Sequence, residues 1–244
     1  MKGNEKSALR LDRYLANAGV GTRSEVKKYI KNGWVTVGER TASDPGQKVN
    51  LLSDVVYFRG TPVVGRTFSY YLFHKPAGCV TARTDSRERT VMDYFPQDMQ
   101  SLSPVGRLDK DTEGLLLVTD DGALNHHLTS PSHRIAKTYY AVLDAPVPGD
   151  AGERFAQGVD IGDEKPTSPA VLEVLPPDSA QAAHARLTIT EGRYHQVKRM
   201  FAAIGCRVLY LKRLSLGPLT LGNLAPGEYR ALSEDEVAEL RREE

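Results

Sequence analysis

Seven short strand-like runs follow residue 68, and they are the feature that most limits what this chain can fold into. These runs, rich in apolar and β-branched residues, lie at 69–74, 78–82, 114–119, 137–143, 170–175, 184–190 and 206–211. Helical patterns occupy short stretches between some of them, at 90–95, 122–129, 150–158 and 195–204. Strands and helices do not alternate regularly. The sequence therefore predicts an α+β domain with a mixed, mostly antiparallel sheet.

The segment before residue 60 has a different pattern, with helical periodicity first and strands afterwards. Apolar residues spaced by three and four predict a helix over 9–18. Thr22 and Glu25 form a capping-box pattern that predicts the start of a second helix, and Gly33 fits the position just past its end. A strand at 34–37 and a second short extended piece follow. This order predicts a small helical and hairpin domain.

Basic residues are concentrated in this first segment. Residues 1–66 hold twelve Lys and Arg but six acidic residues, although the whole chain has a formal net charge of +1. Arg23, Lys27 and Lys31 recur every four residues, with Lys28 beside them, so one face of the second helix carries four cations. Such a face is either solvated surface or a binding site for a polyanion, and the basic surroundings favour binding.

The division between the two patterns predicts the domain organisation. The stretch at 60–68 contains two Gly and a Pro and is typical of a linker. We therefore expect an N-terminal domain over 7–60, a linker over 61–68 and a larger domain over 69–244.

Several classes of protein are excluded by the sequence. The longest clear apolar run, Leu115–Val118, is far shorter than the ~20 residues of a membrane span, and the first ten residues lack the apolar core of a secretory signal. Cys79 and Cys206 cannot build a disulfide framework or a four-cysteine zinc site and are expected to be buried. His126 and His127 have no ligand spacing around them that predicts a metal site. We expect a cytoplasmic protein.

The stretch PVGRLDKDTEGLLLVTDDG at 104–122 places three carboxylates directly before an apolar strand. Asp109, Asp111 and Glu113 have the spacing of an EF-hand-like calcium loop, but the four apolar residues that follow predict a buried strand instead of the polar half of such a loop. A polar surface turn is a second interpretation. The third is an active-site loop at the end of a strand, in which Gly106 allows the close approach of a ligand.

Three motifs together resemble those of the RsuA family of pseudouridine synthases: GRLDKDTEGLLLVTDDG, AKTYYAVL and EGRYHQVKRMFAAIG. The resemblance extends through GPLTLGNLAPGEYRAL near the C-terminus. The N-terminal LRLDRYLANAGVGTRSEVKKYIKNGWVTVGE resembles an S4-like RNA-binding module over residues 8–55. Together these segments cover nearly the whole chain and imply a catalytic domain of the pseudouridine synthase type.

The resemblance implies roles for four residues. Asp109 matches the catalytic aspartate, and Lys198 matches the basic residue that pairs with it and keeps it ionised. Tyr139 matches the aromatic residue on which the target uracil stacks. Arg107 resembles the residue that fills the space left by the flipped uridine, and flipping is required because a stacked base hides the reacting atoms. Breaking the N1–C1′ bond and forming a C5–C1′ bond involves no net oxidation or reduction, so no cofactor is expected.

The resemblance also implies an RNA substrate and RNA-contacting residues. The residues expected to contact RNA outside the catalytic centre are Arg23, Lys27, Lys28, Lys31, His195 and Arg199. HQVKRM favours the branch that acts on small-subunit 16S rRNA, on a uridine of the uridine-516 type, either naked or in an assembling particle. The chain is expected to act as a monomer. Two alternatives stay open: a synthase for 23S rRNA and a non-enzymatic rRNA-binding assembly factor.

Overall fold

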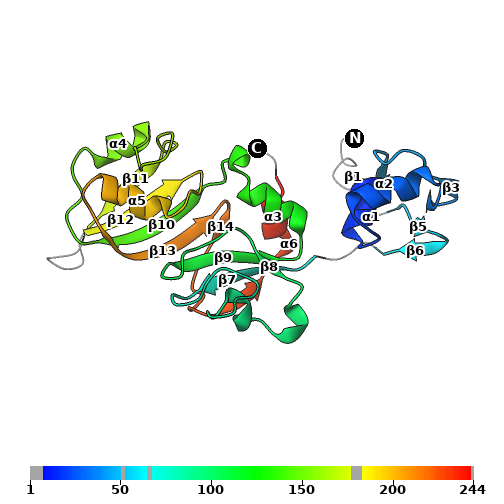
Figure 1. Ribbon diagram of the computed structural model, residues 1–244, viewed down its shortest axis with the longest axis horizontal. Coiled ribbons are helices and arrows are strands. Elements are labelled where there is room, and N and C mark those ends of the chain that lie inside the picture. Colours follow the sequence, from blue (N-terminus) through cyan, green and yellow to red (C-terminus); the bar gives the residue numbers. More distant parts are fainter. Residues whose placement is uncertain (1–7, 51–52, 65–67, 177–182, 243–244) are drawn as a thin grey trace. The chain divides into compact units, whose positions relative to one another are not determined.

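The chain divides into two compact units, Met1–Phe68 and Ser69–Glu244 (Figure 1). The computed structural model describes residues 8–50, 53–64, 68–176 and 183–242. Among these residues, no helix has the length and apolar character needed to cross a membrane.

The described residues of the first unit form two helices and six short strands. In chain order they are β1 (Ala8–Arg10), α1 (Leu11–Asn17), α2 (Arg23–Lys31), β2 (Val35–Val37), β3 (Arg40–Thr41), β4 (Lys48–Asn50), β5 (Val56–Phe58) and β6 (Thr61–Val63). The predicted capping box is confirmed, because Thr22 Oγ1 accepts the Glu25 amide and Glu25 Oε2 accepts the Thr22 amide. Leu15, Val26 and Ile30 are fully buried in the core of this unit.

Two expectations for the first unit differ from the structure. The helix predicted over 9–18 begins only at Leu11, because residues 8–10 pair with β4 as an antiparallel strand. The expected linker over 61–68 begins with β6, which pairs with β5, and residues 65–67 of that linker lie outside the described part of the chain. In both places, strand pairing overrides the local pattern.

The second unit is built around one large sheet. Its strands are β7 (Tyr70–Lys75), β8 (Ser103–Pro104), β9 (Glu113–Thr119), β10 (Lys137–Leu143), β11 (Val171–Leu175), β12 (Ala183–Ile189), β13 (Val208–Leu216), β14 (Leu219–Thr220) and β15 (Tyr229–Ala231). Its helices are α3 (Gly122–Thr129), α4 (Ala151–Gln157), α5 (Gln196–Ala203) and α6 (Glu234–Leu240), with 3₁₀ turns at Val91–Tyr94, Gln97–Met99 and Pro131–His133.

The strand order in this sheet is β11–β12–β10–β13–β9–β7–β15, with β14 paired to β13 and β8 to β9. Neighbouring strands are antiparallel except β9 and β13, which run parallel where Glu113 and Gly114 face Lys212 and Arg213. The predicted α+β class and mostly antiparallel sheet are confirmed. The strand predicted at 78–82 is wrong, because this segment forms only an isolated bridge between Val80 and Thr90.

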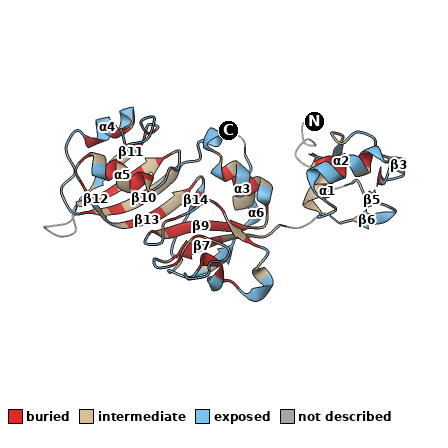
Figure 2. Cartoon of the chain, viewed as in Figure 1, coloured by how far each residue is buried: buried red, intermediate tan, exposed pale blue. Residues whose placement is uncertain are grey.

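Strand β9 is buried on both faces, which explains its continuous apolar sequence (Figure 2). Leu116 and Val118 face one core, with the apolar side of α5. Leu115 and Leu117 face the other, which includes Leu residues of α3 and α6 (Figure 1). The strand is therefore held from both sides, and the loop at its start has a fixed position.

Gly114 makes the parallel contact between β9 and β13 possible. Its φ is +109°, and a Cβ built there would lie 2.2 Å from the carbonyl oxygen of Arg213. No side chain fits in that space without moving one strand away from the other.

Substituting Gly114 with Ala is expected to destabilise the protein by about 2–4 kcal/mol, because the methyl group overlaps the backbone of β13 and the φ is unfavourable. Chemical denaturation of the variant measures this change. The matched control is Gly122→Ala, at the first position of α3, where φ is ordinary and a Cβ meets nothing within 4 Å. Equal stabilities of the two variants would contradict the close approach of β9 and β13.

Candidate active site

A cleft of about 710 Å³ opens in the second unit, where the loops at the ends of β9, β10, β12 and β13 meet α5. Arg107, Asp109, Tyr139, His195 and Lys198 all line it. Residues separated by ninety positions in the sequence therefore share one cavity. Its walls carry six Lys and Arg side chains but two acidic ones, Asp109 and Glu191, which favours an anionic ligand.

Asp109 lies in the loop between β8 and β9 and is half-buried. Its Oδ2 is 3.2 Å from Lys198 Nζ, and its Oδ1 is 3.4 Å from His195 Nε2. Both partners come from α5 or the residue before it. The carboxylate is thus within ion-pair distance of the Lys198 ammonium and beside the His195 ring.

Lys198 also binds a second carboxylate that the sequence analysis did not assign to the site. Its Nζ donates to Asp111 Oδ1 at 2.6 Å and Oδ2 at 2.8 Å, so the ammonium lies between two acidic side chains. Burial by itself would lower the pKa of Lys198, but the bonds to Asp111 and Asp109 raise it overall. Lys198 is therefore held protonated here. Its bond to Asp111 is the main cause of the lowered pKa of Asp111. Asp109 and Asp111 thus share one positive charge, that of the Lys198 ammonium.

The loop that carries Asp109 is fixed by two buried residues that the sequence analysis also missed. Lys75, at the end of β7, has no exposed surface, and its Nζ donates to the carbonyl oxygens of Pro76, Lys110 and Thr112. Thr81 Oγ1 donates to the Leu108 carbonyl at 2.7 Å and accepts the Leu108 amide at 3.1 Å. The HKPAG motif at 74–78, which contains Lys75, is the one signal that could have pointed to this part of the chain, and Thr81 lies three residues beyond it.

Tyr139 lies on β10 with its ring in the cleft and 8% of its surface exposed. Side chains alternate along a strand, so the next residue, Tyr140, points to the other face and bonds His184. In the register of the sheet, Tyr139 is opposite Arg213 of β13. The aromatic ring is therefore part of the cleft wall, whereas its neighbour is structural.

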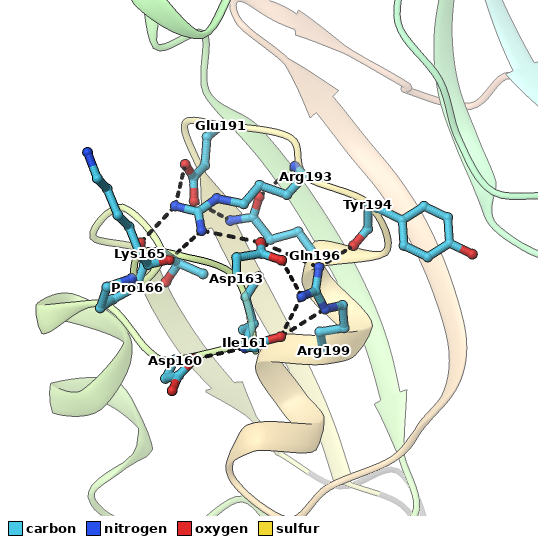
Figure 3. Close-up of polar contacts among 12 residues, drawn as sticks. Asp160, Ile161, Asp163, Lys165, Pro166, Glu191, Arg193, Tyr194, Gln196 and Arg199 are labelled. Carbon is cyan, nitrogen blue, oxygen red and sulfur yellow. Dashed lines mark hydrogen bonds and ion pairs between the residues drawn. The ribbon is translucent and has the colours of Figure 1, made fainter.

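A network of polar contacts holds the segment before α5 in place (Figure 3). Arg193 donates to the carbonyl oxygens of Lys165 and Pro166, and Gln196 bonds both the Arg193 amide and Glu191. These contacts tie the 160–167 loop to the start of the helix. His195, with a φ of +48°, is held at the cleft by this arrangement.

Arg199, expected to contact RNA, makes several contacts within the protein. Its guanidinium donates to the carbonyl oxygens of Ile161 and Tyr194 and to Asp163, whose pKa it lowers (Figure 3). These donors are engaged within the protein because the 160–167 loop folds against α5. Tyr194 precedes α5, and 76% of its surface is exposed.

The remaining predicted residues are exposed. Arg107 lies on the rim of the cleft. Arg23, Lys27, Lys28 and Lys31 are exposed on α2 in the first unit. The described residues contain no group of three or more side chains suited to hold a metal ion, and Leu115–Val118 is a buried strand instead of a calcium loop.

Lys137, two residues before Tyr139 on β10, also lines the cleft. Burial, and then the nearby charge of Arg213, lower its pKa from 10.5 to about 8. A lysine with a lowered pKa destabilises the folded state fully below pH 8, and this penalty fades between pH 8 and 10.5 as the folded state loses its proton first.

Lys137→Met is therefore expected to increase the free energy of unfolding at pH 7 relative to the wild type, and this gain should shrink as the pH rises from 8 to 10.5. Urea unfolding at several pH values measures the difference. Lys165→Met, at an exposed lysine, is the control. The difference in free energy of unfolding between this variant and the wild type should stay constant from pH 8 to 10.5. If the difference in free energy of unfolding between Lys137→Met and the wild type does not change with pH, burial does not lower the pKa of Lys137.

Comparisons with known proteins show what this chain is similar to. Residues 69–203 match the model of the RNA pseudouridylate synthase family, and residues 9–56 match the S4 domain. An uncharacterized RNA pseudouridine synthase of Bacillus subtilis, YtzG, is 44% identical over 94% of this chain and 97% of its own length. Ribosomal small subunit pseudouridine synthase A of Escherichia coli K12 is 42% identical over 95% of this chain and 100% of its own. A crystal structure of a pseudouridylate synthase has a TM-score of 0.68 and 38% identity, covering 95% of this chain and 99% of that one.

Proposed function

Because the chain belongs to the RNA pseudouridylate synthase family, we propose that it isomerises one uridine of the small-subunit 16S rRNA and that Asp109 is its catalytic carboxylate. The observation that carries this proposal is the carboxylate of Asp109 in the cleft, 3.2 Å from the Lys198 ammonium and in the same cavity as the Tyr139 ring. The small-subunit target is inferred from relatives that share about 42% of their residues with this chain over almost their full length.

The reaction needs an ionised carboxylate beside the sugar–base bond. The N1–C1′ bond breaks, a C5–C1′ bond forms, C5 loses its proton to solvent and N1 gains one. Asp109 is suited to this chemistry because its carboxylate lines the cleft and pairs with the Lys198 ammonium at 3.2 Å. Tyr139 supplies a flat ring in the cleft wall on which the extruded uracil can stack.

Two further features fit an RNA substrate. Arg107, exposed at the rim, can occupy the space that the flipped uridine leaves. The exposed cations of α2 lie in the unit that matches the S4 domain, and we assign them to rRNA phosphates. We also propose that the protein acts as a monomer, in the cytoplasm where rRNA is assembled.

Mapping the pseudouridines of rRNA with and without this protein tests the target. The proposal predicts the loss of one pseudouridine from 16S rRNA in its absence, restored by the wild-type protein. A lost site in 23S rRNA would move the target to the large subunit. An unchanged set of pseudouridines would favour the alternative, an RNA-binding assembly factor without activity.

Asp109→Asn is expected to lower the rate of tritium release from rRNA labelled at uracil C5 by ~1,000-fold or more, because the amide cannot replace the ionised carboxylate. The exposed Asp98 offers a matched control, and Asp98→Asn should keep the wild-type rate. Equal tritium release by the wild type and Asp109→Asn would remove Asp109 from the reaction.

The basic face of α2 makes a separate prediction. Lys27→Ala combined with Lys28→Ala should weaken rRNA binding and reduce the slope of log affinity against log salt by about 1.5, since each lost phosphate contact contributes about 0.7–0.9. Filter binding at several salt concentrations measures this slope. Arg40→Ala, an exposed cation on β3, is the control. If the slope of the double variant matches the wild type, the α2 face is solvated surface.

A further inference from the structure

Arg213 is a buried cation whose bonding capacity is mostly unused. Only 3% of its surface is exposed, and its Nε donates to the Leu115 carbonyl at 2.7 Å. Its Nη2 is buried and has no hydrogen-bond partner among the described residues. A guanidinium has five N–H donors, and burying a charge without an anion costs several kcal/mol. The residue nevertheless lines the cleft.

The position of Arg213 cannot adjust to relieve this cost. Its backbone is fixed in the parallel contact with Gly114, which leaves no room for movement toward β9. Lys75 is a useful comparison, because it is equally buried but its ammonium donates to three carbonyl oxygens. Lys75 is therefore satisfied by the protein, whereas the Nη2 of Arg213 is not. An orphan donor of this kind in a cleft indicates a ligand.

Lys137 is a second cation on the same side of the sheet. Lys137 and Tyr139 are two residues apart on β10 and so share one face, and Tyr139 is opposite Arg213. Lys137 Nζ donates to the Ile135 carbonyl at 2.6 Å, and no ion pair joins either cation to an acidic side chain among the described residues. By contrast, Lys198 and Arg193, which also line the cleft, each pair with a carboxylate.

We propose that Arg213 and Lys137 form a subsite for a backbone phosphate of the RNA, beside the ring of Tyr139. This inference rests on the proposed function, because it assumes that a flipped uridine enters the cleft. A phosphate supplies the anionic partner that these two cations do not have in the protein. A uracil oxygen is neutral and does not supply one. The guanidinium of Arg213 keeps its charge at every physiological pH and is a strong donor to phosphate oxygens.

The subsite also accounts for how the nucleotide is oriented. A base stacked on Tyr139 and a phosphate held at Arg213 and Lys137 fix the nucleotide at two points on one face of the sheet. The sugar between these points then has a defined position relative to Asp109 across the cleft. Arg213 and Lys137 therefore act as substrate-binding residues.

The test uses short RNAs that contain the target uridine, each with one phosphate next to it replaced by a neutral methylphosphonate. Wild-type protein should bind one of these RNAs about tenfold more weakly than the unmodified RNA. Lys137→Met and Arg213→Gln should bind the unmodified RNA more weakly but lose little further affinity on neutralisation, because the partner of that phosphate is already gone. Lys165→Met, an exposed lysine, should keep the full wild-type loss.

Equal losses in the wild type and both variants, or no loss at either phosphate in the wild type, would overturn the subsite. Lys137→Met keeps the test decisive if Arg213→Gln does not fold, because Lys137 is less buried and has a single hydrogen bond. Tritium release from the unmodified RNA by the wild type reports on the proposed function separately. If the wild type releases tritium but wild type and variants lose equal affinity on neutralisation, only the subsite is rejected. If the wild type releases no tritium from any rRNA, the proposed activity is rejected.

Discussion

The two-residue parallel contact between β9 and β13 is the constraint on which the second unit depends. It joins two antiparallel halves of one sheet, and it exists because Gly114 has no side chain to separate the strands. The carboxylate loop precedes β9, and Arg213 lies on β13, so this contact brings Asp109 and the aromatic wall of β10 to one cleft. Burial of β9 on both faces then makes the arrangement rigid.

Charge in the cleft is distributed unequally between its walls. On the α5 side, Lys198 is shared between Asp109 and Asp111, and these contacts raise the pKa of the ammonium and lower the pKa of Asp111. On the sheet side, Arg213 and Lys137 have no acidic partner among the described residues. A ligand that is neutral at its reacting carbon and anionic at its phosphates matches both walls. This is the charge pattern of a nucleotide in RNA.

Much of this could be predicted from the sequence wherever the signal was local. The apolar run at 115–118 indicated a buried strand, and Thr22 with Glu25 indicated the start of α2. The features that the sequence did not predict depend on residues far away in the chain. The segment at 78–82 has a strand-like pattern but pairs only through one bridge. The contact of Arg199 with Ile161, 38 residues away, also has no local signal. Lys75 and Arg213 were missed because a buried lysine or arginine has no pattern that separates it from a surface one.

A crystal structure of the Asp109→Asn variant with an RNA that contains the target uridine tests the central claim most directly. The account predicts that this uridine is flipped into the cleft, with its ring against Tyr139 and its C1′ next to the side chain of residue 109. A uridine that stays stacked in the RNA, or that binds away from the junction of β9 and β13, would contradict it.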